Sequence, residues 1–243
     1  MYSLLKKEIN SFLSSFIGYV TIVIFLLING LFLFVFPTGF NIFDLGYANI
    51  DGLFLMAPFV FLFLIPAITM RMYAEERSLG TIEMLYTKPL SDFEIVMAKY
   101  LAGVFLVVLS LLPTLLYFIT VYFVGMPVGN IDIAGMSGSY LGLLFLGSAF
   151  VAIGLFSSSV TDNQIVSFIV AVAISAFLYM GFELIYQLFL FGEIDLLIKN
   201  LGISAHYSSM SRGVIDSRDV VYFLSVDALF ILLTKFSIGK RKW

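Results

Sequence analysis

Few side chains in this sequence are of a type that could do chemistry, and they stand far apart. His206 is the single histidine, and the 243 residues contain no cysteine. A histidine without carboxylate or thiol partners nearby makes a poor metal site, because a bound metal needs several donors, so we expect His206 to form a hydrogen bond at an interface. No stretch matches the Gly-x-x-x-x-Gly-Lys-Ser/Thr pattern that cradles nucleotide phosphates. We therefore predict no catalytic residue, no metal, no cofactor and no nucleotide site in this chain.

Asp227 stands inside the apolar stretch of residues 220–236. A charge is expensive inside a membrane, so a residue of this kind is a functional candidate by default. A proton relay would need a second such group, and Glu183 lies near the end of its own apolar stretch rather than within it. The alternative is a hydrogen-bonded Asp227 that faces the interior of a helical bundle.

Composition places the chain in a membrane. Hydrophobic residues make up 61% of it and charged residues 12%, with a mean hydropathy of +1.06, whereas soluble domains are about 45–50% apolar and about 25% charged. The polar surface is too small to coat a water-soluble globule, and lipid can face the excess apolar side chains. The net charge is −3, and no basic block stands outside the extreme C-terminus, which argues against nucleic acid as a partner.

Six apolar stretches are long enough to cross a bilayer, since a hydrocarbon core of about 30 Å needs roughly 20 helical residues. They are residues 16–36, 53–70, 99–124, 139–157, 164–184 and 220–236. The short alternating segments of a β-barrel are absent, so we predict an all-α membrane protein. Six spans put both termini and the second and fourth loops on one side. All Lys and Arg residues except Lys199, Arg212 and Arg218 lie on that side, which predicts that both termini are cytoplasmic.

Residues 1–15 form a different kind of element. Leu4, Leu5, Ile9, Phe12 and Leu13 fall largely at helical spacing, and polar residues fill much of the rest. This pattern predicts an amphipathic helix in the cytoplasmic interface before the first span. The alternative is a mere continuation of that span.

The loop of residues 71–98 is rich in charge and has defined breaks. We expect the second span to continue as helix past the membrane surface and to stop near Gly80, because glycine readily follows a helix end. Thr81 can cap a short helix over residues 82–87, which ends before Pro89. Ser91 and Glu94 then form a capping box that opens the helix into the third span.

Ile82, Leu85 and Tyr86 share one face of the short helix, and Glu83 lies in its first turn. An apolar face on a cytosolic helix must meet membrane, its own bundle or another protein. Packing on its own bundle is therefore the alternative to a docking role.

On the outer side, residues 191–219 carry apolar side chains at helical spacing without enough length to span, which predicts short helices. These helices either re-enter the outer leaflet or form an exposed external hairpin. Asp216 or Ser217 is placed to cap the sixth span. Gly138 and Gly142 form a small-xxx-small pair that permits close helix contact.

The charged loop resembles the cytoplasmic loop of ABC type-2 transporter permeases. The shared pattern Glu-Arg-x-x-Gly-Thr-x-Glu-x-Leu-x-x-x-Pro is matched by Glu76, Arg77, Gly80, Thr81, Glu83, Leu85 and Pro89. In that family the short helix of this loop is the coupling helix, which docks into a groove of a cytosolic ABC ATPase subunit. The resemblance implies an ATPase contact at Glu76, Arg77, Gly80, Thr81, Ile82, Glu83, Leu85, Tyr86 and Pro89. The family plan of an interfacial helix and six spans covers residues 1–243 as a single permease domain.

Four strings, taken in order, resemble the gliding-motility-associated ABC permease subunit of Bacteroidetes-type bacteria. They are Phe-Leu-Ile-Pro-Ala at 63–67, Thr-Lys-Pro-Leu-Ser at 87–91, Thr-Asp-Asn-Gln at 161–164 and Arg-Gly-Val-Ile-Asp-Ser-Arg-Asp-Val at 212–220. The resemblance implies a bacterial cytoplasmic membrane, contact with membrane lipid, a second permease copy or related permease chain, and a companion subunit with a periplasmic domain. It also implies short re-entrant helices between the fifth and sixth spans.

We therefore expect the permease subunit of an ATP-driven transporter. It would couple ATP hydrolysis by a separate ATPase to transport, export or force transmission, in association with gliding motility. One alternative is a structural, force-relaying component of a motility or secretion apparatus without transport. The other is a stand-alone proton-coupled transporter that depends on Asp227.

Overall fold

The computed structural model describes residues 1–44, 46, 48–87, 89–188, 192–213 and 215–239. Helix makes up 81% of the structure, and no strand occurs in the part of the chain that is described. The predicted all-α fold is confirmed.

Six helical segments are long and apolar enough to cross a membrane, and each contains most or all of one predicted span. Three are unbroken helices: α2 (Phe16–Phe34), α8 (Ile133–Val160) and α13 (Ser217–Gly239). The second span joins α3 (Asp51–Thr69) to α4 (Arg71–Ser78). The third runs through α6 (Asp92–Leu111), the 3-10 turn η1 (Leu112–Thr114) and α7 (Leu115–Val124). The fifth runs through α9 (Gln164–Ala176), the π-helical turn η2 (Phe177–Gly181) and α10 (Phe182–Gln187).

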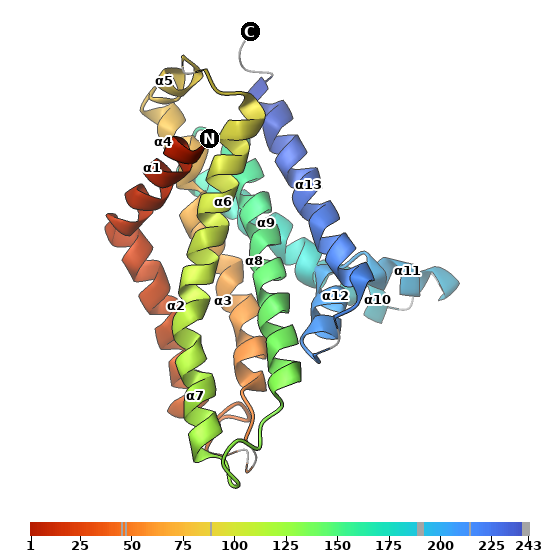
Figure 1. The fold of residues 1–243 in the computed structure, drawn as a ribbon. Helices are drawn as coiled ribbons and strands as arrows, with labels where there is room; N and C mark the ends of the chain where they lie inside the picture. Colours follow the sequence, from red (N-terminus) through yellow and green to blue (C-terminus); the bar gives the residue numbers. More distant parts are fainter. Residues whose placement is uncertain (45, 47, 88, 189–191, 214, 240–243) are drawn as a thin grey trace.

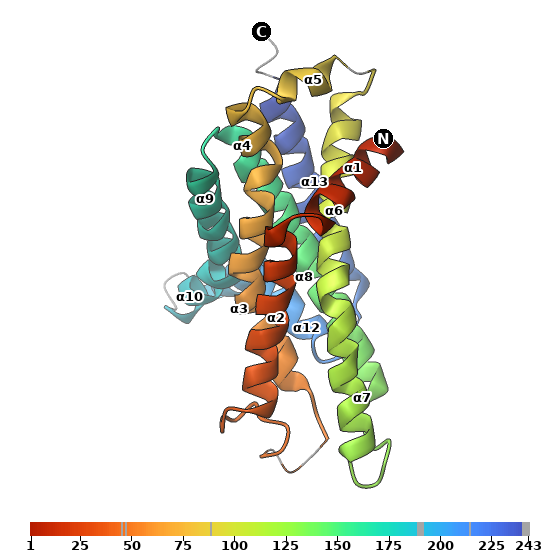
Figure 2. The same ribbon diagram turned by 90° about the vertical axis from the view of Figure 1, so that its left-hand side faces the viewer.

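Helix α8 is the centre of the bundle, and α3, α6, α9 and α13 pack around it (Figures 1 and 2). Its glycines allow this close packing. A Cβ added at Gly147 would lie 2.5 Å from Cγ1 of Val107 in α6, and one at Gly154 would collide with Oγ1 of Thr69 in α3. The small residues of α8 therefore fix how closely the second and third spans approach it.

The second span breaks at Met70, and a serine from α8 fixes the break. The Ser158 hydroxyl donates to the Met70 carbonyl (2.9 Å) and accepts from the amides of Tyr73 and Ala74 (both 3.0 Å). These two amides lie in the first turn of α4, where a helix leaves N–H groups without a partner of its own. Ser158 thus caps α4 from a neighbouring helix and sets the direction in which α4 leaves the bundle.

The predicted external segment starts at residue 191, which lies outside the described residues. The described part of the segment contains the predicted short helices. They are η3 (Gly192–Ile194), α11 (Asp195–Asn200) and α12 (Ile203–Met210). Helix α12 is anchored in the bundle, because the buried Tyr207 donates a hydrogen bond to the Phe54 carbonyl of α3 (2.6 Å). Gly142 provides the expected close helix contact, since a Cβ there would lie 3.1 Å from Cβ of Met210 in α12, and one at Gly138 would lie 2.8 Å from Cα of Gly213 just after that helix.

Candidate functional site

The segment before the first span is a helix of its own, α1 (Tyr2–Leu13). Helix α2 begins after Ser15, whose hydroxyl accepts a hydrogen bond from the Gly18 amide (3.1 Å), so the alternative of a continuous first span is wrong. The elbow is tight, because a Cβ at Gly18 would collide with the Phe12 carbonyl oxygen. Leu4 and Glu8 are only 5% and 6% exposed, and α1 packs against α6.

The loop between α4 and α6 has most of the predicted breaks. Gly80 has a φ of +69°, a conformation that suits glycine after a helix end. The short helix α5 spans Ile82–Tyr86, and the Ser91–Glu94 capping box is formed (3.3 and 2.9 Å). The prediction for Thr81 was wrong. Its hydroxyl donates back to the Glu76 carbonyl (3.2 Å) instead of capping α5, because Thr81 itself has a helical backbone that turns its side chain away from the amides ahead.

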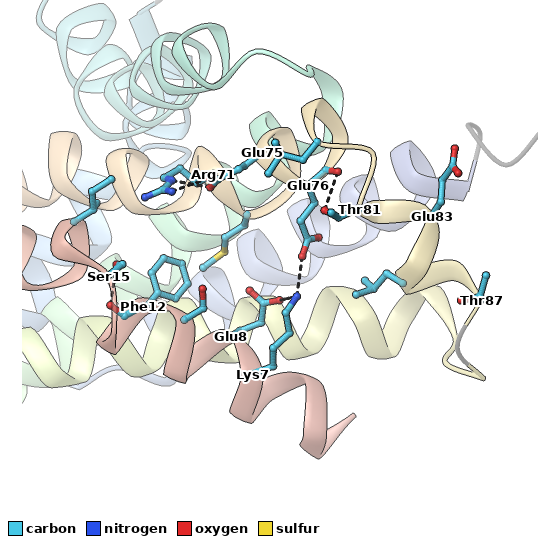
Figure 3. A pocket seen from close by; sticks show the side chains of 15 residues that line it. Lys7, Glu8, Phe12, Ser15, Arg71, Glu75, Glu76, Thr81, Glu83 and Thr87 are labelled. Atoms are coloured by element: carbon cyan, nitrogen blue, oxygen red, sulfur yellow. Dashed lines mark hydrogen bonds and ion pairs between the residues drawn. The ribbon is translucent and has the colours of Figure 1, made fainter.

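Four charged side chains from three helices meet beneath this loop, and we call Lys7, Glu8, Glu76 and Lys99 the charge cluster. Lys99 of α6 is completely buried, with Nζ 3.1 Å from Oε1 of Glu8 and 2.9 Å from Oε2 of Glu76. Nζ also donates to the Met72 carbonyl (2.8 Å). Lys7 Nζ lies 3.2 Å from Oε1 of Glu76 and 3.6 Å from Oε1 of Glu8. Figure 3 shows Lys7 and Glu8 of α1 pointing toward Glu76 of α4.

The charges of the cluster balance, which explains why Glu8, Glu76 and Lys99 can be largely buried beside the exposed Lys7. Burial alone lowers the pKa of the Lys7 ammonium, but the Glu76 and Glu8 carboxylates outweigh that effect and raise its pKa above the ordinary value. Removing one partner of a buried ion pair leaves an uncompensated charge, at a cost of about 3–5 kcal/mol. The cluster therefore holds α1, α4 and α6 together.

Arg77, the second residue of the charged motif, also turns inward. Its side chain is 7% exposed, and Nη1 lies 3.6 Å from Oδ1 of Asp162, in the turn between α8 and α9. Glu76 and Arg77 thus tie the end of α4 to the rest of the chain. Neither presents a free charge to a partner protein.

The predicted contact residues separate into a buried group and an exposed group. Leu85 is 5% exposed and belongs to the core, so the apolar face of α5 packs partly on its own bundle. The exposed residues include Gly80, Thr81, Glu83 and Pro89, and Ile82 is half-buried. Leu79, which the sequence comparison did not single out, is 68% exposed. The side chain of Tyr86 lies outside the described residues.

A hollow of about 960 Å³ opens beside these residues, between α1 on one side and α4 and α5 on the other. Phe12 and Met72 line its apolar part, and the charge cluster contributes Lys7, Glu8 and Glu76 (Figure 3). Its size is in the range of pockets that hold a ligand or side chains of a partner.

Asp227 faces the interior of the bundle and is 5% exposed. Its Oδ2 accepts hydrogen bonds from Tyr100 of α6 and Ser148 of α8, both at 2.9 Å. These contacts match the alternative of a hydrogen-bonded residue that joins α13 to α6 and α8. A role in transport stays a prediction.

His206 joins the external segment to the sixth span, so the expected hydrogen bonding is confirmed. Nδ1 lies 2.6 Å from Oδ1 of Asp219, Nε2 lies 2.8 Å from the Asn200 carbonyl, and the ring stacks on Tyr222 (3.9 Å). The expectation of a histidine without a carboxylate neighbour was wrong, because the fold brings Asp219 of α13 next to α12.

Sequence reasoning missed Glu8 and Lys99 as members of the cluster. A weak signal was present for both. Glu8 interrupts the apolar stripe of α1 between Leu4 and Phe12, and Lys99 stands at the start of an apolar stretch. A charge at either place needs a partner, but the spacing does not identify that partner.

Comparison with known proteins places the chain in a family. Residues 38–199 match the family model described as ABC-2 family transporter protein. No match to a curated protein was found. The matched region runs from before α3 to α11 and includes the charged loop, Lys99 and the central helix α8. This multi-pass membrane protein therefore belongs to the ABC-2 transporter family.

Proposed function

We propose that a separate ABC ATPase subunit docks on the exposed part of the loop between α4 and α6, and that the chain converts ATP-driven movement of that subunit into rearrangement of its spans. Family membership makes the chain the membrane subunit of an ABC transporter and implies an ATPase partner. The observation that carries the docking proposal is the exposure of Leu79, at 68%, beside Gly80 and Glu83 at one end of the bundle.

The connections around this surface support a coupling role. Helix α4 continues the second span, and its start is capped by Ser158 of the central helix. The capping box at Ser91 begins the third span directly after the loop. A push on α5 therefore reaches the second span through a hydrogen-bonded turn, in which Thr81 donates to the Glu76 carbonyl. The third span begins at Asp92, soon after α5 ends at Tyr86.

The same proposal fixes the orientation. The start of α1, the loop with α5 and the end of α13 lie at one end of the bundle (Figure 1), and an ATPase needs that end in the cytoplasm of a bacterial cell. We propose that the permease pairs with a second copy of itself or a related chain. The exposed leucines of α11, Leu196 and Leu197 at 62% and 65%, support re-entry of residues 191–219 into the outer leaflet.

The docking test compares two aspartate variants at equally exposed apolar positions. Leu79→Asp should abolish co-purification of the ATPase from mild detergent. Ile165→Asp, at a residue that is also 68% exposed but lies in the first turn of α9, should leave co-purification unchanged. Equal recovery of the ATPase with both variants, or recovery of no ATPase with the native chain, would contradict the proposal.

The four strings that resemble a gliding-motility permease support the finer proposal that the complex serves gliding motility, together with a subunit that has a periplasmic domain. Deletion of the gene should then abolish gliding, and the native chain should restore it. A Leu79→Asp chain that no longer captures the ATPase yet restores gliding would favour the structural, force-relaying role without transport.

A further inference from the structure

The charge cluster joins helices that are far apart in the sequence, since Glu8 and Lys99 are separated by 91 positions. Three oxygen atoms, from Glu8, Glu76 and the Met72 carbonyl, lie within 3.1 Å of Lys99 Nζ. Nζ donates hydrogen bonds to Glu8 and to the Met72 carbonyl, and its contact with Glu76 is an ion pair. Lys99 is completely buried beside the two glutamates, so it cannot leave without exposing an uncompensated charge. The Lys7 side chain is 55% exposed, so water screens its ion pair with Glu76 and that pair contributes little.

The cluster lies where it can transmit movement from one helix to another. The hollow separates α1 from α4 and α5, so these elements are bridged by the side chains of the cluster rather than by packed backbones. Helix α4 leads into the exposed loop, and α1 leads through the tight elbow at Gly18 into the first span. Of the four members, Lys99 is the one that touches both glutamates from a third helix, α6.

We propose that Lys99 is a positioning residue for coupling, which locks α1 to α4 so that the interfacial helix and the first span move with the loop. The inference rests on the proposed function, because it assigns the first span to the unit that the ATPase moves. With the lock in place, movement of α4 reaches the first, second and third spans together. Without it, α1 stays behind on the surface of α6.

The lock can be measured on the full chain alone in lipid nanodiscs. Spin labels are attached at Ser3→Cys in α1 and Ser78→Cys at the end of α4, two exposed positions in a chain without other cysteines. The native background should give one narrow distance distribution. Lys99→Met should add a population at longer distance, and Lys99→Arg, which keeps the charge, should not.

Arg71→Gln is the matched control, because it removes an ion pair (2.7 Å to Glu75) that lies within α4 alone and joins no other helix. Its distribution should equal the native one. If Lys99→Met does not fold, Glu8→Gln removes only the part of the lock that belongs to α1 and should produce the same longer population. A native distribution in the folded variant, Lys99→Met or Glu8→Gln, overturns the lock.

A second measurement separates the lock from docking. The Lys99→Met chain should still capture the ATPase, because Leu79 and Glu83 are unchanged, but its α1 should no longer follow α4 when a non-hydrolysable ATP analogue is added. A native chain that captures no ATPase overturns the proposed function. The spin-label result on the chain alone decides the lock in either case.

Discussion

Ser158→Ala removes the hydroxyl that caps the first turn of α4. Ser158 is fully buried, and its hydroxyl holds the Met70 carbonyl and the amides of Tyr73 and Ala74. An unsatisfied buried donor costs about 1–3 kcal/mol, and a helix cap contributes about 0.5–2 kcal/mol. Because two amides lose their acceptor and water cannot replace it, we expect the free energy of unfolding to fall by about 2–4 kcal/mol.

The neighbouring serine provides a matched control. Ser159 is equally buried, but its hydroxyl donates only to the Phe156 carbonyl of its own helix (2.7 Å). That carbonyl keeps its helical surroundings, so Ser159→Ala should cost under about 1 kcal/mol.

Unfolding in SDS from mixed micelles, followed by circular dichroism, compares the two variants with the native chain. The Ser158→Ala midpoint should shift clearly further than the Ser159→Ala midpoint. Equal midpoints for the two variants would refute the reasoning that Ser158 holds the break between α3 and α4.

Other predictions test the bundle and its outer face. Asp227→Asn should preserve transport activity and stability, because an amide oxygen still accepts a hydrogen bond from Tyr100. Loss of transport activity at an unchanged unfolding midpoint would favour the proton-coupled alternative. Gly147→Ala should destabilise the bundle by about 1–3 kcal/mol, because the added methyl group overpacks against Val107. Adding Val107→Ala to the same chain should restore much of the lost stability, measured by SDS unfolding. A double variant no more stable than Gly147→Ala would contradict the contact between these two residues. His206→Phe keeps a ring in place but loses both hydrogen bonds, so limited proteolysis should cut the external segment faster, and an unchanged cleavage rate would contradict its anchoring role.

The sequence predicted the parts of the fold that depend on local pattern. Six apolar stretches of spanning length allow one fold class in lipid, and the structure has all six. Gly80 and the Ser91–Glu94 pair were also predictable, because a helix end and a capping box depend on residues within four positions of each other. The prediction that Thr81 caps α5 was wrong. A threonine hydroxyl can accept a hydrogen bond from an amide ahead of it or donate one to a carbonyl behind it, and the spacing alone does not show which of the two forms.

The candidate site was less predictable because its key contacts are long-range. The pattern of α5 indicates an apolar face, but only the tertiary structure shows that Leu85 packs inward while Leu79 is exposed. Glu76 was assigned to a partner contact, whereas the fold buries it against Lys99 of α6. A buried ion pair between distant segments leaves no periodic trace in the sequence.

The charge cluster also has a consequence for biosynthesis. Glu8 is made early, but Lys99 follows 91 residues later, which at bacterial and eukaryotic synthesis rates of 5–20 residues per second is a delay of about 5–18 s. Until then Glu8 lacks its buried countercharge, so the docking of α1 stays incomplete while the first two spans enter the membrane. Helix α1 is thus synthesised before the six spans but completes its contacts only when the third span has been made.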